Sequence, residues 1–398
     1  MNIRGISCPP ATRSLFQCNQ TKIKYRVLVE DLLRKPADNS CVRFRAEYAL
    51  CLASALFVVS FTGCKSSSGG SEAQSVELNG AGSTFVYPVM SRWTSSFSNA
   101  HSNVRINYQS IGSGGGVQQV KNGTVDFGAS DAALNDDQLN GMKPMIQIPE
   151  SAGPVCITYS LPGLDKPMQL SPEAIAGIFL GKITSWQDPL LVKDNPGVSL
   201  PSTKILVSHR TDGSGTTNAF TTYLAAVSPE WQQKVGVGNS VDWPVGIGGK
   251  GSEGVTAQVR QTPGAIGYVE LTFAQQNKLP VAAVKNLSGK YVLPDTASTT
   301  AAIAAFTDQL SKDPRTPIVN APASAPDAYP ISTLTFLIIP KDGPDVAKRT
   351  ALRNFVQYVI TDGQAAAATL NYAPLPEGVK SYDRQQLQQM TAAGQPLP

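Results

Sequence analysis

The chain has 398 residues, of which 41% are hydrophobic and 16% charged, and its formal net charge is +4. This length allows two or three domains with a sizeable core, and the low charged fraction excludes a disordered or highly charged protein. The basic excess lies in residues 1–63, which carry nine of the 33 basic and four of the 29 acidic residues, so that 24 basic and 25 acidic residues remain without them, a net charge of −1. Non-specific binding to nucleic acid is therefore not expected.

Residues 42–63 are typical of an export signal. The run 49-ALCLASALFVVSF-61 follows two arginines and is too short to span a bilayer as a lone helix. It leads into FTGC, which resembles a bacterial lipobox, so we expect Cys64 to become the lipidated first residue of the exported protein. A signal peptide cut elsewhere and a buried core helix are the alternatives. The polar stretch at 64–75 predicts a flexible tether, and residues 1–41 indicate a misassigned start codon.

The six cysteines do not predict a disulfide framework. Four of them lie in residues 1–63, so the exported chain keeps Cys64 and Cys156. With lipid on Cys64, the thiol of Cys156 has no partner. Its place in the apolar run 155-VCITY-159 predicts a buried, inert thiol.

From residue 76 the sequence alternates short strands with helices, which predicts an α/β fold. Strands are expected at 76–78, 104–111 and 124–131. Each strand ends in a loop rich in Gly, Ser, Thr or Asp, and two of these loops open helices. Because ligands in open α/β sheets bind outside the carboxyl ends of the strands, we expect the loops to converge on one site.

A second group of elements begins near Leu161. A helix is predicted after Ser171, because a proline typical of the first helical position follows this residue. The stretch 207-VSHRTDGSGTTNAFTTYL-224 indicates a strand end, a tight turn and a helix start. Further along, the Pro/Ala-rich residues 312–330 suggest a crossing segment before a buried strand at 331–339.

The helix start within 207–224 has the chemistry of an anion site, although an ordinary capped surface helix is the alternative. A helix N-terminus presents unpaired N–H groups and the positive end of a dipole. Arg210 adds a full positive charge, which Asp212 can orient by a paired contact. Asp131 is expected at the same strand-end edge, and a carboxylate there suits an anion that carries a proton, such as monohydrogen phosphate. Hydroxyl groups lie at or beside the expected helix starts at Thr84, Ser113, Ser214 and Thr216.

Other kinds of chemistry are disfavoured. The chain has two histidines, His101 and His209, and neither stands in a motif for a zinc site or a Ser-His-Asp triad. The run 246-GIGGKGSEG-254 fails as a phosphate loop, because Lys250 is followed by glycine rather than by Ser or Thr. It is read as a turn into a helix. We therefore predict no metal, no cofactor and no enzymatic activity.

Seven segments resemble the periplasmic phosphate-binding proteins of Pst-type phosphate ABC transporters. They occur in the family's order with similar spacing over about residues 76–398. The segments are 79-NGAGSTF-85, 108-YQSIGSGGGV-117, 123-GTVDFGASDAAL-134, 178-IFLGKITSW-186, 210-RTDGSGTT-217, 246-GIGGKGSEGV-255 and 264-GAIGYVE-270. The resemblance implies an α/β, two-lobed type II periplasmic-binding-protein fold with a hinge and a ligand cleft between the lobes. It places lobe 1 at 76–160 plus 328–398 and lobe 2 at 161–327.

The resemblance also implies the ligand contacts. They fall on Thr84, Phe85 through its backbone N–H, Ser113, Asp131, Arg210, Ser214, Gly215 and Thr216. Two departures from the family are minor. His209 stands beside the key arginine where the family can carry another basic residue, which leaves the local field open, and Cys156 is not a family hallmark.

These expectations describe a monomeric, lipid-anchored receptor that binds inorganic phosphate with high affinity and delivers it to a phosphate ABC permease. It would be exported to the periplasm or cell surface of a bacterium. The alternatives are a receptor for another tetrahedral oxyanion, such as sulfate, and a phosphatase. The carboxylate of Asp131 disfavours the first, because it repels a fully ionised anion. The second lacks a nucleophile with its base, or a set of metal-binding carboxylates.

Overall fold

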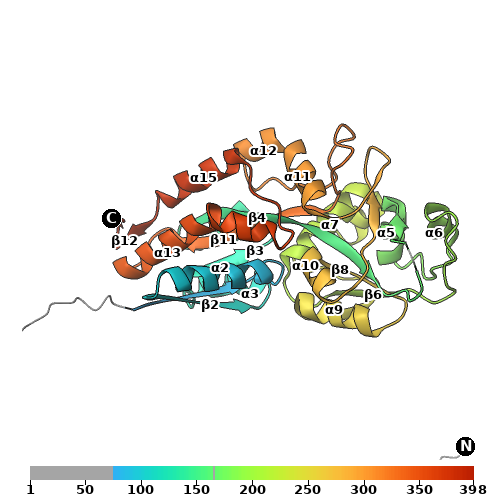
Figure 1. The fold of residues 1–398 in the computed structure, drawn as a ribbon, viewed down its shortest axis with the longest axis horizontal. Helices are drawn as coiled ribbons and strands as arrows, with labels where there is room; N and C mark the ends of the chain where they lie inside the picture. The colour runs from blue at the N-terminus through green and yellow to red at the C-terminus, as the bar shows by residue number, and fades with distance from the viewer. Residues whose placement is uncertain (1–74, 165) are drawn as a thin grey trace, which may run out of the picture. The chain divides into compact units, whose positions relative to one another are not determined.

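A computed structural model of the chain (Figure 1) describes residues 75–164 and 166–398, which fall within one compact unit. The predictions for the upstream extension at 1–41, the signal peptide at 42–63, the lipidated Cys64 and the tether up to residue 74 lie outside the described residues.

The described strands and helices alternate along much of the chain, as the sequence pattern predicts. The strands are β1 (Val76–Gly82), β2 (Val104–Ser110), β3 (Phe127–Ser130), β4 (Met145–Tyr159), β5 (Gln169–Leu170), β6 (Leu206–Arg210), β7 (Ile247–Gly249), β8 (Ala265–Glu270), β9 (Ala283–Lys285), β10 (Tyr291–Val292), β11 (Ser332–Pro340), β12 (Thr391–Ala392) and β13 (Gln395–Pro396). The helices are α2 (Tyr87–Ala100), α3 (Ser113–Lys121), α4 (Asp136–Leu139), α5 (Pro172–Phe179), α6 (Pro189–Asp194), α7 (Gly215–Val227), α8 (Pro229–Lys234), α9 (Gly251–Gln261), α10 (Leu271–Gln276), α11 (Thr296–Ala305), α12 (Thr307–Lys312), α13 (Val346–Ile360), α14 (Gly363–Ala368) and α15 (Glu377–Leu387).

The largest sheet has eight strands in the order β2-β1-β3-β11-β4-β8-β6-β7. On one side, β1 is parallel to β2 and β3, and on the other side β6 is parallel to β7 and β8. The strands β11 and β4 lie between these groups and run antiparallel to their neighbours. Parallel strands within each group bring their carboxyl ends, and the loops that follow, to a common edge.

The long strand β4 connects the two groups of strands (Figure 1). Its residues 145–154 pair with β11, and its residues 155–159 pair with β8. The partner changes between Pro154, opposite Ser332, and Val155, opposite Glu270. One continuous strand therefore carries the backbone from the first group of elements to the second.

Aromatic side chains build the core beneath the first group of strands. Along α2, Trp93 and Phe97 are buried at the spacing expected for an amphipathic helix. The ring of Phe97 packs edge-on against Phe355 of α13, with ring centroids 5.4 Å apart. The indole N–H of Trp93 donates to the carbonyl oxygen of Gly363 at 2.7 Å, so this large buried side chain also satisfies its polar atom.

Helices α11 and α12 share a core with β11 and α15. Ile303, Leu310 and Ile318 are buried in one cluster with Ile338 of β11 and Val379 of α15. These apolar side chains are therefore covered by β11 and α15, which follow later in the chain.

Cys156 is fully buried in β4, and it is a free cysteine in the part of the chain that the structure describes. Burial, with a further effect of the charge of Glu270, raises the pKa of this thiol well above its usual value. A thiol that stays protonated is a poor nucleophile, so the inert role predicted for Cys156 is consistent with its surroundings.

Asp383 of α15 is a buried carboxyl without a hydrogen-bond partner. Its side chain is fully covered, and neither carboxyl oxygen has a partner among the described residues. Burial raises the pKa of Asp383 to about 9. The folded protein therefore keeps a proton on Asp383 at neutral pH, whereas the unfolded chain, with a pKa of about 3.9, releases it. It follows that this group lowers stability progressively as the pH rises from about 4 to about 9.

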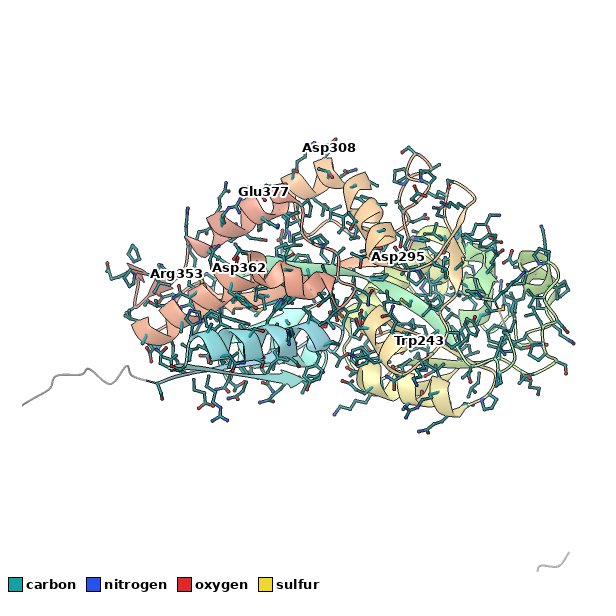
Figure 2. The ribbon with its side chains drawn as sticks, viewed as in Figure 1. Trp243, Asp295, Asp308, Arg353, Asp362 and Glu377 are labelled. Atoms are coloured by element: carbon teal, nitrogen blue, oxygen red, sulfur yellow. The ribbon has the colours of Figure 1, made fainter. Side chains whose placement is uncertain are left out.

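We expect Asp383→Asn to remove this pH dependence, because an amide does not titrate. The free energy of unfolding of the variant, relative to the parent, should increase from pH 5 to pH 8 by up to about 1.4 kcal/mol per pH unit. Urea unfolding of both proteins at the two pH values measures this. Asp308→Asn on α12, an exposed position (Figure 2), is the matched control and should leave the difference constant. A constant difference for Asp383→Asn as well would contradict the buried neutral carboxyl.

Candidate functional site

The sequence-predicted site residues come together where the ends of β1, β3 and β6 meet the starts of α2, α3 and α7. Residues 83–86 connect β1 to α2, and Gly112 with φ +86° leads into α3. The second half of the sheet contributes residues 211–214, which lead into α7. A backbone hydrogen bond from Gly114 N–H to the carbonyl oxygen of Gly213, at 2.9 Å, links the two halves directly.

Ser113, the first residue of α3, holds three of these segments in place. Its Oγ accepts the N–H of Gly215 at 3.0 Å and the N–H of Asp131 at 3.3 Å. Ser214 caps α7, since its side chain accepts the N–H of Thr217 at 3.1 Å. The predicted hydroxyl and backbone groups of both halves are therefore buried around one point.

Asp131 lies at the centre of the cluster and is 3% exposed. Its Oδ2 accepts the hydroxyl of Thr216 at 2.9 Å, and its Oδ1 accepts the hydroxyl of Ser83. Burial raises the pKa of Asp131 to about 6, although the hydrogen bonds from Ser83 and Thr216 and the charge of Arg210 all act to lower it. Asp131 is thus ionised at neutral pH and close enough to its pKa to titrate under mildly acidic conditions.

Arg210 is buried, with 4% of its surface exposed, and forms the paired contact with Asp212 that the sequence indicates. Its Nε donates to Asp212 Oδ1 at 2.7 Å and its Nη2 to Oδ2 at 2.5 Å. Burial acts to raise the pKa of Asp212, but the hydrogen bonds and charge of Arg210 outweigh this effect and hold it below its usual value. Nη1 of Arg210 makes no hydrogen bond within the described residues, so the fork is fixed in place with one donor group left over.

Thr84 and Phe85 occupy the loop between β1 and α2. The ring of Phe85 is buried against Tyr372, whose hydroxyl donates to the carbonyl oxygen of Phe85 at 2.7 Å. The hydroxyl of Thr84 contacts Ser252, at the start of α9, with 2.8 Å between the two oxygens. A cavity of about 210 Å³ lies beside Thr84 and Asp212, and a larger one of about 340 Å³ is lined by Asp131.

His209 adds no permanent charge to the site. Its ring stacks on Trp243, labelled in Figure 2, with centroids 4.9 Å apart. Burial lowers the pKa of His209 from its usual value, so the ring is neutral at neutral pH. At the end of β6, Arg210 therefore carries the positive charge and His209 adds none.

Sequence reasoning missed Ser83 and Ser252. Ser83 stands in the same NGAGST loop as Thr84, so the signal that pointed to Thr84 applies equally to the hydroxyl of Ser83. Ser252 directly follows the glycines of 246–251, which were read as a turn into a helix. The structure confirms that reading, since α9 begins at Gly251.

No group of three or more His, Cys, Asp or Glu side chains that could hold a metal ion lies within 75–164 and 166–398. Over the same ranges, no helix has the length and apolar character needed to cross a membrane.

Comparison with known proteins places this chain in one class. The PBP superfamily domain matches residues 67–363 of the chain. The phosphate-binding protein PstS of Xylella fastidiosa (strain Temecula1) is 41% identical over 353 residues, which covers 84% of this chain and 95% of that protein. PstS of Haemophilus influenzae is 40% identical over 313 residues, covering 78% and 92% of the two chains. This chain belongs to the PBP superfamily, and within it to the family of PstS phosphate-binding proteins.

Solved structures agree on the fold. A high-affinity periplasmic phosphate-binding protein bound with phosphate is similar with a TM-score of 0.61 and 23% identity, covering 78% of this chain and 93% of that one. A phosphate-binding protein from Stenotrophomonas maltophilia gives a TM-score of 0.59 at 21% identity, covering 79% and 94%. The α/β, two-lobed fold class expected from the sequence is confirmed by these neighbours.

Proposed function

We propose that this protein binds inorganic phosphate and delivers it to a phosphate ABC importer. The observation that carries the proposal is a buried cluster in which an arginine clamped by Asp212, several hydroxyls and backbone N–H groups surround the carboxylate of Asp131. Its relatives are named for phosphate binding, and a structural neighbour holds phosphate. The proposed contacts are Thr84, Phe85, Ser113, Asp131, Arg210, Ser214, Gly215 and Thr216.

The chemistry of the cluster matches monohydrogen phosphate. The remaining donor of Arg210 compensates the negative charge, and the helix starts add the positive ends of their dipoles. Neither Thr84 nor Phe85 has a hydrogen-bond partner for its backbone N–H among the described residues, so both groups are available. The carboxylate of Asp131 accepts the O–H of the ligand. Every polar atom of a dehydrated phosphate would then find a partner, which a buried anion requires.

We further propose that the ligand bridges two lobes. Lobe 1 comprises about residues 76–154 and the C-terminal part of the chain from α11 onward, and lobe 2 comprises the intervening residues. The change of partner along β4 and the shared core of α11, β11 and α15 support this division. Since the hydrogen bond from Thr216 to Asp131 crosses between the lobes, closure brings the two halves of the site together.

Calorimetry with phosphate, sulfate and arsenate, together with solution scattering, tests the proposal. We expect phosphate to bind more tightly than sulfate, and the radius of gyration to fall when phosphate saturates the protein. A generic phosphomonoester assay separates binding from hydrolysis, and we expect no turnover. Absence of phosphate binding would contradict the function, whereas binding without compaction would contradict only the two-lobe clamp.

We also propose that the protein is an exported, monomeric lipoprotein that docks on a phosphate permease in the membrane. The FTGC sequence before the polar tether supports the lipid anchor. We expect the mature protein to begin at Cys64 and to carry acyl groups there, and mass spectrometry of the native N-terminus measures both. A chain that starts at Met1, or an unmodified cut further along the tether, would contradict the anchor.

A further inference from the structure

Ser252 contacts the cluster from the far half of the sheet. It is the second residue of α9 and is 1% exposed, and Thr84 opposite it is 2% exposed. Two contacts join these side chains. The backbone N–H of Ser252 donates to Thr84 Oγ1 at 3.2 Å, and the two hydroxyl oxygens lie 2.8 Å apart. The residues are 168 positions apart in the chain, and on the proposed division they belong to different lobes.

The number of donors and acceptors on a hydroxyl limits the hydrogen bonds that Thr84 can form. A threonine hydroxyl has one proton to donate and two lone pairs that can accept. The N–H of Ser252 occupies one lone pair. In the contact between the hydroxyls either oxygen can be the donor. A phosphate oxygen near Thr84 settles the direction, because a deprotonated phosphate oxygen can only accept. Thr84 then gives its proton to the ligand, and the hydroxyl of Ser252 donates to the second lone pair of Thr84.

We propose that Ser252 is a positioning residue that directs the hydroxyl proton of Thr84 toward the ligand when the lobes close. This inference rests on the proposed phosphate-binding function and adds a residue outside the contacts given above. Ser252 supplies two donors, so both lone pairs of Thr84 are occupied and its proton has one direction left. Because the two donors come from the opposite lobe, this orientation exists only in the closed protein.

The start of α9 also contacts the second charged part of the site. The N–H of Gly251 donates to Asp212 Oδ1 at 2.9 Å, and Asp212 in turn holds Arg210. Gly251 has φ +67°, and a Cβ on it would lie 2.5 Å from a carboxyl oxygen of Glu253 and 3.5 Å from Thr84. The first turn of α9 therefore positions Arg210 through Asp212, and it positions Thr84 through Ser252. Closure of the lobes then orients both of these ligand donors.

Ser252→Ala tests the proposal, because it removes the hydroxyl donor and keeps the backbone N–H. We expect the rate of phosphate dissociation to rise about three- to tenfold, the effect of one lost hydrogen bond. The association rate should stay within about twofold, since the contact forms only after the ligand is enclosed. Stopped-flow measurement of phosphate association and dissociation shows which of the two rates changes. A dissociation rate equal to that of the parent would overturn the proposal.

A double-mutant cycle separates positioning from a general structural role. In a Thr84→Val background the hydroxyl to be oriented is missing, so adding Ser252→Ala should change the dissociation rate by less than about twofold. An equal effect in both backgrounds would overturn the proposal. Ser110→Ala is the matched control, because Ser110 donates to Glu253 of α9 at 3.5 Å at the exposed rim. We expect it to leave both rates within about twofold of the parent.

Two further measurements make the result for Ser252 interpretable even if a variant is unstable or phosphate does not bind. Thermal unfolding of each ligand-free variant checks the fold. On the parent protein, hydrogen exchange of the Ser252 amide should slow by about fivefold or more when phosphate saturates, and unchanged exchange would overturn the inference. If the parent binds no phosphate, the proposed function itself fails. If the parent binds phosphate and the cycle shows no coupling, only the role of Ser252 fails.

Discussion

Arg210→Ala is expected to weaken phosphate binding by about tenfold or more while the fold persists. Each hydrogen bond to a charged group contributes roughly 1.5–3 kcal/mol, and Arg210 is the full positive charge in the proposed contact set. The structure adds a second reason for a large effect. Without Arg210, the carboxylate of Asp212 loses both of its guanidinium hydrogen bonds, and its negative charge near the anion is no longer compensated. Calorimetry with phosphate measures the loss.

The effect of the uncompensated Asp212 carboxylate can be separated from the loss of the arginine's own contacts with the ligand. Arg210→Ala combined with Asp212→Asn should recover part of the lost affinity, because the repelling carboxylate is gone. Arg210→Lys should fall between parent and alanine variant, since lysine keeps the charge but loses the fork. Arg260→Ala, which removes an exposed arginine of α9 that donates to Asn277, is the matched control. Binding by Arg210→Ala within about twofold of the parent would mean that Arg210 does not reach the ligand.

Asp131→Asn is expected to gain sulfate binding relative to phosphate. Phosphate and sulfate are close in size and shape, so a cleft of donors alone would separate them poorly. The carboxylate of Asp131 accepts the O–H of phosphate, but opposite sulfate it meets another acceptor, which costs several kcal/mol in a dry site. Asparagine keeps the shape and supplies N–H donors. Competition titrations at neutral pH measure the change in preference.

The pKa of Asp131 makes the same prediction testable in the parent protein. Burial raises this pKa to about 6, so the carboxyl is ionised above pH 6 and protonated below it. Sulfate has no proton to lose in this range. Its binding to the parent should therefore strengthen as the pH falls from 7 to 5, whereas binding to Asp131→Asn should change little. If sulfate affinity has the same pH dependence in both proteins, the carboxyl of Asp131 does not discriminate between phosphate and sulfate.

Local patterns predicted much of the strands and helix starts that frame the site, although the strand expected at 124–131 is shorter, Phe127–Ser130, in the structure. The alternating apolar residues predicted β2 almost to its ends, and the Gly/Ser/Asp turns correctly located the starts of α3 and α7. The prediction for β1 stopped too early, at residue 78, because Asn and Gly disfavour strands. The structure continues β1 to Gly82. A Cβ on Gly80 would lie 2.2 Å from the ring of Phe127, so this glycine serves close packing between strands rather than a turn.

What the sequence could not reveal depends on contacts between distant segments. No local pattern relates Thr84 to Ser252, because their contact exists only after two halves of the sheet have assembled. The same holds for α11 and α12. Their burial depends on the apolar faces of β11 and α15, which follow later in the chain. The site was predictable as a set of loops, together with the pairing of Arg210 with Asp212, but the contact between Thr84 and Ser252 was not.

The place of β11 in the sheet has a consequence for how the protein is made. This strand lies between β3 and β4, and its Thr333 donates to the carbonyl oxygen of Asp131, 202 residues earlier in the chain. The sheet on that side can therefore be completed only after residue 340 has left the ribosome. Until then, the neighbouring edges of β3 and β4 have no partner between them, and such long-range pairing is slow to form. Synthesis order alone thus delays completion of this part of the sheet until most of the chain has been made, and an incompletely folded polypeptide is the state that can still be threaded through a narrow secretion channel.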